Sequence, residues 1–348
     1  MLDLAGRDLL SSLDLTPEEV RALLAFARDI KAGRARPALE RKVGAFVFFN
    51  PSVRTRVSCE SAMARFGGTG ITLAAGKDTW NFECGEGVVM DGSTQEHVRE
   101  LAPVLSRMGH LVGIRKSELI TVGLDRSGVT TSYGELAKDE FLHRFTEFAE
   151  VPVINLESNR WHPLQGLADA LTIQERLPVP RGKKYVLTWT WHPKSLPVAT
   201  PHSQLVAAAD LGMHVTLLRP EGFGLEPEVV RAARARAESE GGSLVETDDV
   251  DAAMRGARVV CAKEWGSLDY YGRFEEERRV KEGLRARWMV DERMLQKTDD
   301  AFFLHCLPVR RNVVVSDGVL DSRRSAVIDE AENRLWTAAA VFGALSPT

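Results

Sequence analysis

The sequence predicts an α/β protein with two doubly wound domains, each built on a mainly parallel sheet. Apolar runs of strand length alternate with helical patterns along the whole chain, which is typical of parallel strands joined by crossover helices. The runs are uninterrupted, as in strands that are covered on both faces. A length of 348 residues also favours two domains over one.

We place the boundary between the two domains after residue 158. Residues 1–158 are expected to form the first domain and residues 159–327 the second. A C-terminal helix, at about residues 328–348, is expected to pack back on the first domain. The chain shows no low-complexity linker at this boundary.

The first predicted helix carries its own start signal. Thr16 suits the N-cap, Pro17 suits the first helical position, and Glu19 completes a capping box. The apolar residues that recur after it at helical spacing are Val20, Leu23, Leu24 and Ala27. This spacing predicts a helix with one buried face.

The remaining elements follow the same alternation of strand and helix. The predicted strands are 44–49, 110–114 and 152–155 in the first domain and 184–189, 214–218, 258–262 and 301–305 in the second. The further predicted helices are 53–66, 163–177, 227–240 and 330–345. Gly67 and Gly68 suit a helix stop. The charged stretch 273–279 is interpreted as solvated surface.

Composition limits the classes of function. Lys and Arg total 45 against 49 Asp and Glu, a net charge of -4, which argues against a nucleic-acid partner but leaves small anions open. The cysteines show no metal-ligand or disulfide-scaffold spacing; they are Cys59, Cys84, Cys261 and Cys306. The chain has no signal-peptide pattern and no apolar run long enough to span a membrane. We therefore expect a soluble, cytoplasmic protein without a metal site.

Residues that follow predicted strands hold the candidate chemistry, because ligands bind beyond the carboxyl ends of parallel strands. The segment 52–56 reads Ser-Val-Arg-Thr-Arg and opens a helix, whose free N–H groups favour an anion. The alternative is a helix cap with surface arginines. Arg115 ends the next strand, and it is either a ligand or a solvated side chain.

Two further segments offer polar groups in the same topological position. His162 and Gln165 share one helix face, so they either hold one small polar group or form an incidental cap. Cys306 follows the last strand and is either packing or a nucleophile, although the sequence places no base beside it. Arg334 lies in a segment that would otherwise be interpreted as a polar helix face.

Taken together, these segments resemble one family over essentially the whole chain. Residues 52–56 resemble the Ser-x-Arg-Thr-Arg phosphate motif of the aspartate and ornithine carbamoyltransferases, residues 162–165 their His-Pro-x-Gln motif, and residues 305–308 their His-Cys-Leu-Pro motif. The Asp-x-x-x-Ser-Met-Gly signature for free ornithine is absent. Four other segments resemble the N-acylornithine branch: 76–80, 89–92, 188–194 and 262–265.

This resemblance implies transfer of a carbamoyl group from carbamoyl phosphate to an N-acylornithine in arginine biosynthesis, by a homotrimer that needs no cofactor. The implied carbamoyl phosphate ligands are Ser52, Val53, Arg54, Thr55, Arg115, His162, Gln165, Cys306, Leu307 and Arg334, with Trp80 from a neighbouring subunit. The implied catalytic residues among them are Thr55, Arg115, His162, Gln165 and Cys306. The implied acylornithine ligands are Gln95, Glu157, His192, Lys263, Leu307 and Arg310.

The predicted identity of the acyl group depends on the residues at two positions. The acetyl-specific pattern has a glutamate where this chain has Gln95, and a carboxylated lysine where it has Val314. Both differences remove negative charge that would repel a succinyl carboxylate. The sequence therefore favours N-succinylornithine, with N-acetylornithine as the alternative and free ornithine less favoured.

Two other classes of protein remain as rivals. A nicotinamide dehydrogenase would need a Gly-x-Gly-x-x-Gly after a predicted strand, which the sequence lacks. A non-catalytic assembly subunit would not need all six of the polar residues Arg54, Thr55, Arg115, His162, Gln165 and Arg334.

Overall fold

The computed structural model describes residues 4–122 and 131–346, and its contacts divide the chain into two compact units. Unit 1 comprises residues 1–121, 136–164 and 334–348, and unit 2 comprises residues 122–135 and 165–333. The chain thus enters unit 2 for the long excursion after Leu164, where the sequence analysis placed the boundary after residue 158.

Unit 1 is built on a parallel four-stranded sheet with the strand order β2-β1-β5-β6. Its strands are β1 (Val43–Phe48), β2 (Thr69–Ala74), β5 (Leu111–Arg115) and β6 (Val153–Glu157). Its helices are α1 (Pro17–Lys31), α2 (Arg54–Arg65), α3 (Val98–Met108), α4 (Glu118–Val122), α6 (Glu140–Phe148) and the last part of α14 (Val327–Leu345), and α5 (Tyr133–Leu136) ends in it. The uninterrupted apolar runs predict β1, β5 and β6, whereas β2 is only partly buried and was not predicted.

The predicted helix signals are present in unit 1. Thr16 Oγ1 accepts from the Glu19 N–H at 3.2 Å, and the Glu19 carboxylate accepts from the Thr16 N–H at 2.8 Å, so the capping box is confirmed. Gly67 follows α2 at φ 81°, a left-handed conformation that favours glycine, and the Gly68 N–H closes the helix end on Met63 O at 3.0 Å.

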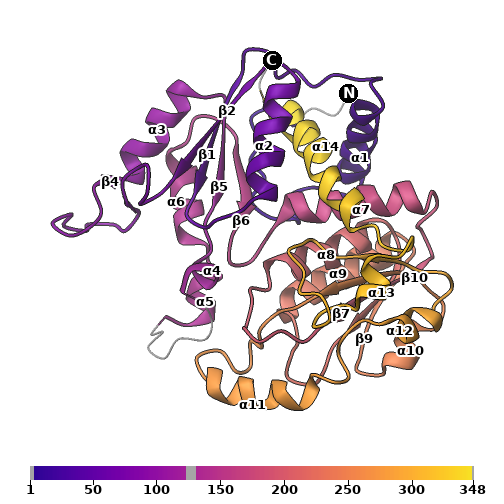
Figure 1. Ribbon diagram of the computed structural model, residues 1–348. Helices are drawn as coiled ribbons and strands as arrows, with labels where there is room; N and C mark the ends of the chain where they lie inside the picture. The colour runs from indigo at the N-terminus through magenta and orange to yellow at the C-terminus, as the bar shows by residue number, and fades with distance from the viewer. Residues whose placement is uncertain (1–3, 123–130, 347–348) are drawn as a thin grey trace. The chain divides into compact units, whose positions relative to one another are not determined.

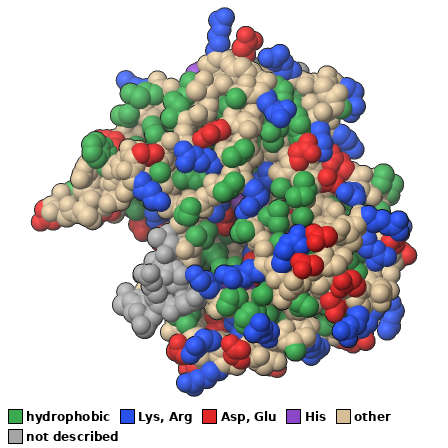
Figure 2. Space-filling model, viewed as in Figure 1, with side chains coloured by type: hydrophobic (Ala, Val, Ile, Leu, Met, Phe, Trp, Pro, Cys, Tyr) green, Lys and Arg blue, Asp and Glu red, His purple; other side chains and the backbone are tan. Residues whose placement is uncertain are grey.

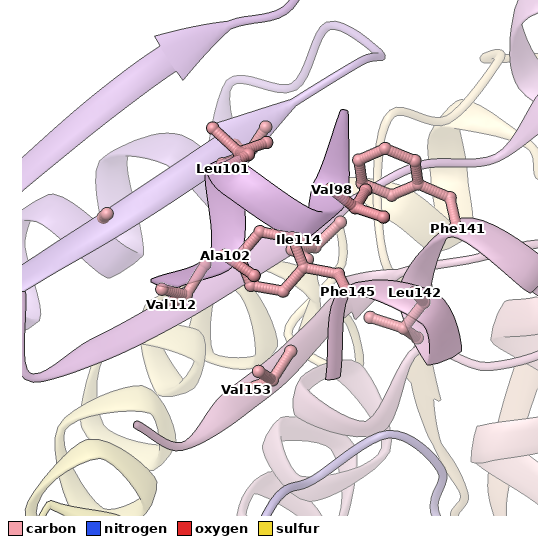
Figure 3. Close-up of a cluster of buried hydrophobic side chains, with 11 residues drawn as sticks. Val98, Leu101, Ala102, Val112, Ile114, Phe141, Leu142, Phe145 and Val153 are labelled. Atoms are coloured by element: carbon pink, nitrogen blue, oxygen red, sulfur yellow. The ribbon is translucent and has the colours of Figure 1, made fainter. Parts of the chain in front are cut away.

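Helices cover both faces of this sheet (Figure 1). On one face α3 and α6 pack against β1, β5 and β6 through buried apolar side chains, among them Leu101, Ile114 and Phe145 (Figure 3). On the other face Phe342 of α14 stacks on Phe46 of β1, with ring centroids 5.6 Å apart. The prediction that the C-terminal helix packs back on the first domain is therefore confirmed.

One segment of unit 1, residues 75–97, projects from the rest of that unit (Figures 1 and 2). It contains the two-residue parallel pair of β3 (Phe82–Glu83) and β4 (Glu96–His97). Phe82 packs against the unit 1 core at the base of the segment, whereas Trp80 is 58% exposed. We refer to residues 75–97 as the projecting segment.

Unit 2 contains a parallel five-stranded sheet with the order β11-β10-β7-β8-β9. Its strands are β7 (Lys184–Trp189), β8 (His214–Leu218), β9 (Ser243–Thr247), β10 (Ala257–Lys263) and β11 (Phe302–Leu304). Its helices are most of α7 (Pro163–Arg176), α8 (Ala199–Asp210), α9 (Pro227–Ser239), α10 (Val250–Met254), α11 (Phe274–Leu284), α12 (Glu292–Gln296) and α13 (Asp317–Leu320). Two α/β units with parallel sheets confirm the predicted fold class.

The charged stretch 273–279 is not merely solvated surface, because it opens helix α11. Glu277 and Lys281 of this helix are buried, and Ser195 Oγ donates to Glu277 Oε1 at 2.5 Å. Lys281 lies 3.4 Å from the same carboxylate. Buried charges are tolerated there because they pair with each other.

Three findings bear on possible partners and ligands. No helix within the described residues is long and apolar enough to cross a membrane. Lys and Arg side chains are interspersed with Asp and Glu on the face shown in Figure 2. Across residues 4–122 and 131–346, no group of three or more His, Cys, Asp or Glu side chains is placed to hold a metal ion.

Candidate functional site

In unit 1 the candidate residues gather at the carboxyl ends of neighbouring strands. Thr55 lies in the first turn of α2, which follows β1, and Arg115 is the last residue of β5. His162 lies between β6 and α7, and Arg334 comes from α14. All four side chains are buried. The parallel topology explains this meeting, because the carboxyl ends of all strands lie at one edge of the sheet.

Direct contacts join these four residues. Arg334 donates from Nη2 to Thr55 Oγ1 at 2.9 Å, and its Nη1 lies 3.4 Å from His162 Nε2. Arg115 pairs through Nη1 with the Glu157 carboxylate, which lies 3.6 Å from His162 Nε2. Two buried guanidinium groups therefore lie in one polar cluster, where planar forks suit the oxygens of a phosphate or carboxylate.

The buried Nε of Arg115 supports an anion at this cluster. It has no hydrogen-bond partner among the residues that the structure describes. Because an unsatisfied buried donor costs about 1–3 kcal/mol, an acceptor at this position would be stabilised. Glu157, expected on the acylornithine side, lies here beside Arg115 and His162.

The segment before Thr55 combines capping with exposed side chains. Ser52 Oγ accepts from the Thr55 N–H at 3.2 Å, and Arg54 is partly buried. Val53 is 73% exposed, so any contact of Val53 with phosphate would use its backbone. Arg56 forms an exposed pair with Glu60 at 3.3 Å, so the surface-arginine alternative holds for this one residue.

Trp80 and Gln95 both lie in the projecting segment of unit 1. The Trp80 side chain is largely exposed, and its carbonyl accepts from the Gly76 N–H at 3.1 Å. Gln95 is exposed, and its backbone N–H donates to Asn81 O at 3.0 Å. Their side chains thus remain available to a ligand or a further chain.

In unit 2 a pair of buried carboxylates holds Gln165. Its amide nitrogen donates to Asp169 Oδ1 at 2.6 Å and to Glu330 Oε1 at 3.1 Å. The other oxygen of Glu330 accepts from the His305 N–H at 2.8 Å. Glu330 therefore connects the start of α7 to the segment that follows β11.

His305 in turn connects to the end of β10. Its Nδ1 accepts from the Leu307 N–H at 3.0 Å, so its Nε2–H is the donor to Glu264 Oε2 at 3.1 Å. Lys263 lies 3.3 Å from the same carboxylate. Burial acts to raise the pKa of Glu264, but Lys263 and His305 hold that pKa well below its usual range. Glu264 is thus a fixed negative charge.

His192, which follows β7, contacts a second predicted ligand. Arg310 Nε donates to His192 Nε2 at 2.9 Å, and His192 Nδ1 lies 3.0 Å from Lys194 O. Arg310 can only donate, so the ring is neutral and carries its proton on Nδ1, which donates to Lys194 O although the Lys194 N–H also lies 3.0 Å from Nδ1. Burial lowers the pKa of His192, and Arg310 and Lys263 lower it further.

The segment after β11 also positions Cys306 and Leu307. Burial raises the pKa of the Cys306 thiol to about 12, so the group is protonated at neutral pH. A protonated thiol argues against the nucleophile alternative. The groups of this segment that could contact a ligand are then those of its backbone. Leu307 adopts φ 54°, an uncommon left-handed conformation for a leucine.

Several residues of this site carry no signal that the sequence analysis used. Asp169, Glu264 and Glu330 are buried carboxylates that contact predicted ligands. Glu264 adjoins Lys263 in segment 262–265, which the resemblance singled out, so the sequence analysis could have included it among the site residues. Asp169 lies one helical turn after Gln165, and this i,i+4 spacing was the available signal.

Comparisons with known proteins agree with the geometry. The carbamoyl-P binding domain of aspartate/ornithine carbamoyltransferase matches residues 7–175, and the Asp/Orn binding domain of the same enzymes matches residues 198–345.

Individual relatives cover nearly the whole chain. An N-acetylornithine carbamoyltransferase of Xanthomonas campestris is 41% identical over 343 residues, 97% of each chain. An N-succinylornithine carbamoyltransferase of Bacteroides thetaiotaomicron is 35% identical over 300 residues, 85% of each chain. A solved structure of a glutamate-to-proline variant of N-acetyl-L-ornithine transcarbamylase, complexed with carbamyl phosphate and N-succinyl-L-norvaline, superposes with a TM-score of 0.91 at 41% identity. It covers 97% of this chain and 99% of that one.

Proposed function

Because the chain belongs to the aspartate/ornithine carbamoyltransferase family, we propose that it transfers the carbamoyl group of carbamoyl phosphate to the δ-amine of N-acetylornithine, giving N-acetylcitrulline and phosphate. Family membership makes the chain an enzyme, a carbamoyltransferase of arginine biosynthesis. The observation that carries the proposal is the buried cluster of Thr55, Arg115, His162 and Arg334, drawn from four distant segments of unit 1.

Carbamoyl phosphate would be held by this cluster through its phosphate. Arg115 and Arg334 supply guanidinium forks, Thr55 supplies a hydroxyl, and the first turn of α2 supplies backbone N–H groups near Ser52 and Arg54. Fixed donors of this kind stabilise the negative charge on the leaving group without reorganising in the transition state.

The carbamoyl group would be oriented by His162, Gln165 and the backbone of Cys306 and Leu307. Gln165 would accept from the carbamoyl –NH2 through its carbonyl oxygen, because its amide nitrogen donates to Asp169 and Glu330. Thr55, Arg115 and His162 would donate toward the carbonyl oxygen as charge develops there.

The chemical step is a substitution at the carbamoyl carbon. The neutral δ-amine forms a bond to that carbon, the bond to the phosphate oxygen breaks, and its electron pair leaves with phosphate. The proton that the amine nitrogen loses is taken by the departing phosphate. Positioning of the two substrates supplies a large part of the rate enhancement.

The acceptor would be recognised mainly by cations. Lys263 and Arg310 are the cations of the cluster around His192, and we assign them to the acceptor's carboxylate. Glu157 lies beside Arg115, from where it would face the amine that approaches the carbamoyl carbon. The neutral acylated nitrogen of the acceptor needs no carboxylate partner.

The acyl group is where the comparisons change the sequence-based preference. The sequence analysis favoured N-succinylornithine, but the acetyl-specific relative is 41% identical over 97% of the chain and the succinyl-specific one 35% over 85%. Similarity over the whole chain therefore favours N-acetylornithine.

One observation keeps N-succinylornithine as a second candidate. A relative with a glutamate replaced by proline was solved with N-succinyl-L-norvaline, and the acetyl-specific pattern has a glutamate where this chain has Gln95. Val314, in place of the lysine of that pattern, is fully buried and apolar. Neither residue would repel a succinyl carboxylate.

The test is turnover of carbamoyl phosphate with three acceptors: N-acetylornithine, N-succinylornithine and ornithine. We expect the highest kcat/KM for N-acetylornithine, by about tenfold or more, as one specific polar contact provides. A higher kcat/KM for N-succinylornithine would establish the second candidate. If none of the three acceptors supports the release of phosphate, the acceptor class is refuted.

We also propose a homotrimer in which Trp80 of one subunit reaches the phosphate site of the next. The exposure of Trp80 on the projecting segment supports this assembly. Mixed trimers of Trp80→Ala and Arg334→Met chains should recover activity, because some sites receive both intact residues. Sedimentation of the wild type as a monomer would refute the trimer.

A further inference from the structure

A buried asparagine in unit 1 has every hydrogen-bonding capacity of its side chain filled. Asn159 Oδ1 accepts from Ser117 Oγ at 2.9 Å and from the Leu119 N–H at 3.2 Å. Its Nδ2 donates to Glu118 Oε2 at 2.6 Å and to Leu136 O at 2.9 Å. Both neighbours of the oxygen are donors and both neighbours of the nitrogen are acceptors, so the amide has one orientation.

A second buried asparagine continues this network to another loop. The Ser117 N–H donates to Asn50 Oδ1 at 2.7 Å, and Asn50 Nδ2 donates to Ser117 O at 3.0 Å. Asn50, Ser117 and Asn159 are each at most 2% exposed. We refer to these three residues as the loop bridge.

The loop bridge joins the three loops that carry the phosphate cluster. Asn50 follows β1 shortly before Ser52, Ser117 follows Arg115 at the end of β5, and Asn159 follows β6 before His162. The strands β1, β5 and β6 are neighbours in the sheet (Figure 1). Each bridging residue thus lies two or three positions from a predicted ligand of carbamoyl phosphate.

A further carboxylate anchors the Asn159 end of this bridge. The Asn159 N–H donates to Asp139 Oδ1 at 2.9 Å, and Ser158 Oγ donates to Asp139 Oδ2 at 2.5 Å. Asn159 is therefore held through both backbone and side chain. A fully satisfied buried network of this kind rigidifies the backbone around it.

We propose that Asn50 and Asn159 are positioning residues for carbamoyl phosphate, acting through Ser117 to fix the spacing of the three ligand-bearing loops. The inference rests on the proposed function, since it assigns a role toward the same phosphate site. None of the three bridging residues is among the predicted ligands of carbamoyl phosphate, and all three are buried. Their effect follows from geometry, because a displacement of about 1 Å in a binding group costs up to about 100-fold in rate.

The chain offers a matched control at the other end of the same strands, where β5 and β6 begin. Ser106 Oγ accepts from the Glu150 N–H at 2.9 Å and donates to Ala102 O at 2.7 Å. Ser106 is buried and joins the segments that precede β5 and β6. Ser106→Ala therefore removes a buried polar bridge between helix α3 and the segment before β6, neither of which carries a predicted ligand.

The test measures the KM for carbamoyl phosphate, the acceptor KM at saturating carbamoyl phosphate, and thermal stability. The variants are Asn159→Ala, Asn50→Ala, the double variant and Ser106→Ala. Ser117→Ala removes only the hydroxyl bond to Asn159 and keeps the backbone bonds to Asn50, so it tests the inference if Asn159→Ala does not fold.

We expect Asn159→Ala to raise the KM for carbamoyl phosphate by about tenfold or more and to leave the acceptor KM within about threefold. Asn50→Ala should act in the same direction. The double variant should cost little more than the worse single variant, because both changes break one bridge. Ser106→Ala should lower thermal stability without raising the KM for carbamoyl phosphate.

Two results would overturn the inference. One is an unchanged KM for carbamoyl phosphate in Asn159→Ala or, if that variant does not fold, in Ser117→Ala. The other is an equal rise in Ser106→Ala at an equal loss of stability. Failure of the wild type to bind carbamoyl phosphate would instead refute the proposed function, and the inference with it.

Discussion

Arg334 Nη2 donates to Oγ1 of Thr55 at 2.9 Å across a sequence separation of 279 residues. The contact brings the last helix of the chain to the first turn of α2, within unit 1. Through its other terminal nitrogen, 3.4 Å from His162 Nε2, Arg334 connects the helix that would hold phosphate to the residue that would orient the carbamoyl group.

Arg334→Met should lower kcat/KM for carbamoyl phosphate by about 100-fold, because it removes a buried donor aimed at the phosphate while keeping side-chain length. Steady-state kinetics at saturating acceptor measure this. Arg181→Met is the control. Arg181 pairs with Glu240 in unit 2, its side chain is 58% exposed, and it is not a predicted ligand. Similar losses in both variants would contradict the assigned role.

The acceptor KM should stay constant as the pH falls to about 6.5, the usual pKa of histidine, and rise only at lower pH. Arg310 donates to His192 Nε2, so the neutral ring is required, and burial lowers the pKa of His192. Protonation would break this bond and place a third cation beside Arg310 and Lys263, although Glu264 opposes part of the repulsion. A rise in the acceptor KM already above about pH 6.5 would count against this pairing.

Asp139→Asn should flatten the dependence of stability on pH. Burial raises the pKa of Asp139 to about 7, so the folded chain holds this proton more tightly than the unfolded chain does. Its contribution is complete below about pH 4 and is lost as the pH rises through about 7. Asn is always neutral and tolerates the left-handed conformation of this position, at φ 48°.

Urea unfolding of both proteins at about pH 5 and about pH 8 measures the effect. The variant should gain stability relative to the wild type at the higher pH, by an amount on the order of 2–4 kcal/mol. Equal differences at the two pH values would show that Asp139 keeps its ordinary affinity for protons.

Cys306→Ala should retain kcat within about tenfold of the wild type, because the protonated thiol is not a nucleophile and the segment acts through its backbone. Burial raises the pKa of Cys306 to about 12, so the wild-type thiol should also react slowly with iodoacetamide at neutral pH. Mass spectrometry of the alkylated chain checks the second point. Rapid labelling of Cys306 would reopen the nucleophile alternative.

Gln95→Glu should lower kcat/KM for N-succinylornithine by about tenfold or more and change that for N-acetylornithine much less, through like-charge repulsion. Gln95→Asn is the neutral control. Because Gln95 is exposed, neither substitution should unfold the chain. Equal thermal stability of the two variants would show that the fall in kcat/KM does not come from a loss of folding. Equal effects on both acceptors would place the acyl group away from this residue.

The sequence predicted the elements whose burial leaves a pattern. Uninterrupted apolar runs indicated most strands of the two sheets, and Thr16 and Gly67 marked helix ends that the structure confirms. Helix α8 gave no such pattern, because all of its residues are buried and no polar face alternates with an apolar one. Strand β9 lies at the sheet edge and is largely exposed, so it forms no apolar run.

The candidate site likewise contains residues that the sequence predicts and residues that only the structure reveals. Arg115 and His162 follow predicted strands, and His162 also belongs to a recognisable motif, so sequence alone could propose them as ligands. Asn159 and Glu330 act through contacts with residues far along the chain, which no local spacing encodes. The assignment of residues 131–135 to unit 2 likewise depends on tertiary packing.

The composition of unit 1 from three separate stretches has a consequence for synthesis on the ribosome. Arg334 leaves the exit tunnel long after Thr55, Arg115 and His162. Domains generally fold as units in the order of their synthesis, yet here the stretch 165–333 is finished before the phosphate cluster is complete. The nascent protein should therefore acquire its affinity for carbamoyl phosphate only after α14 has emerged, so binding follows the synthesis of unit 2.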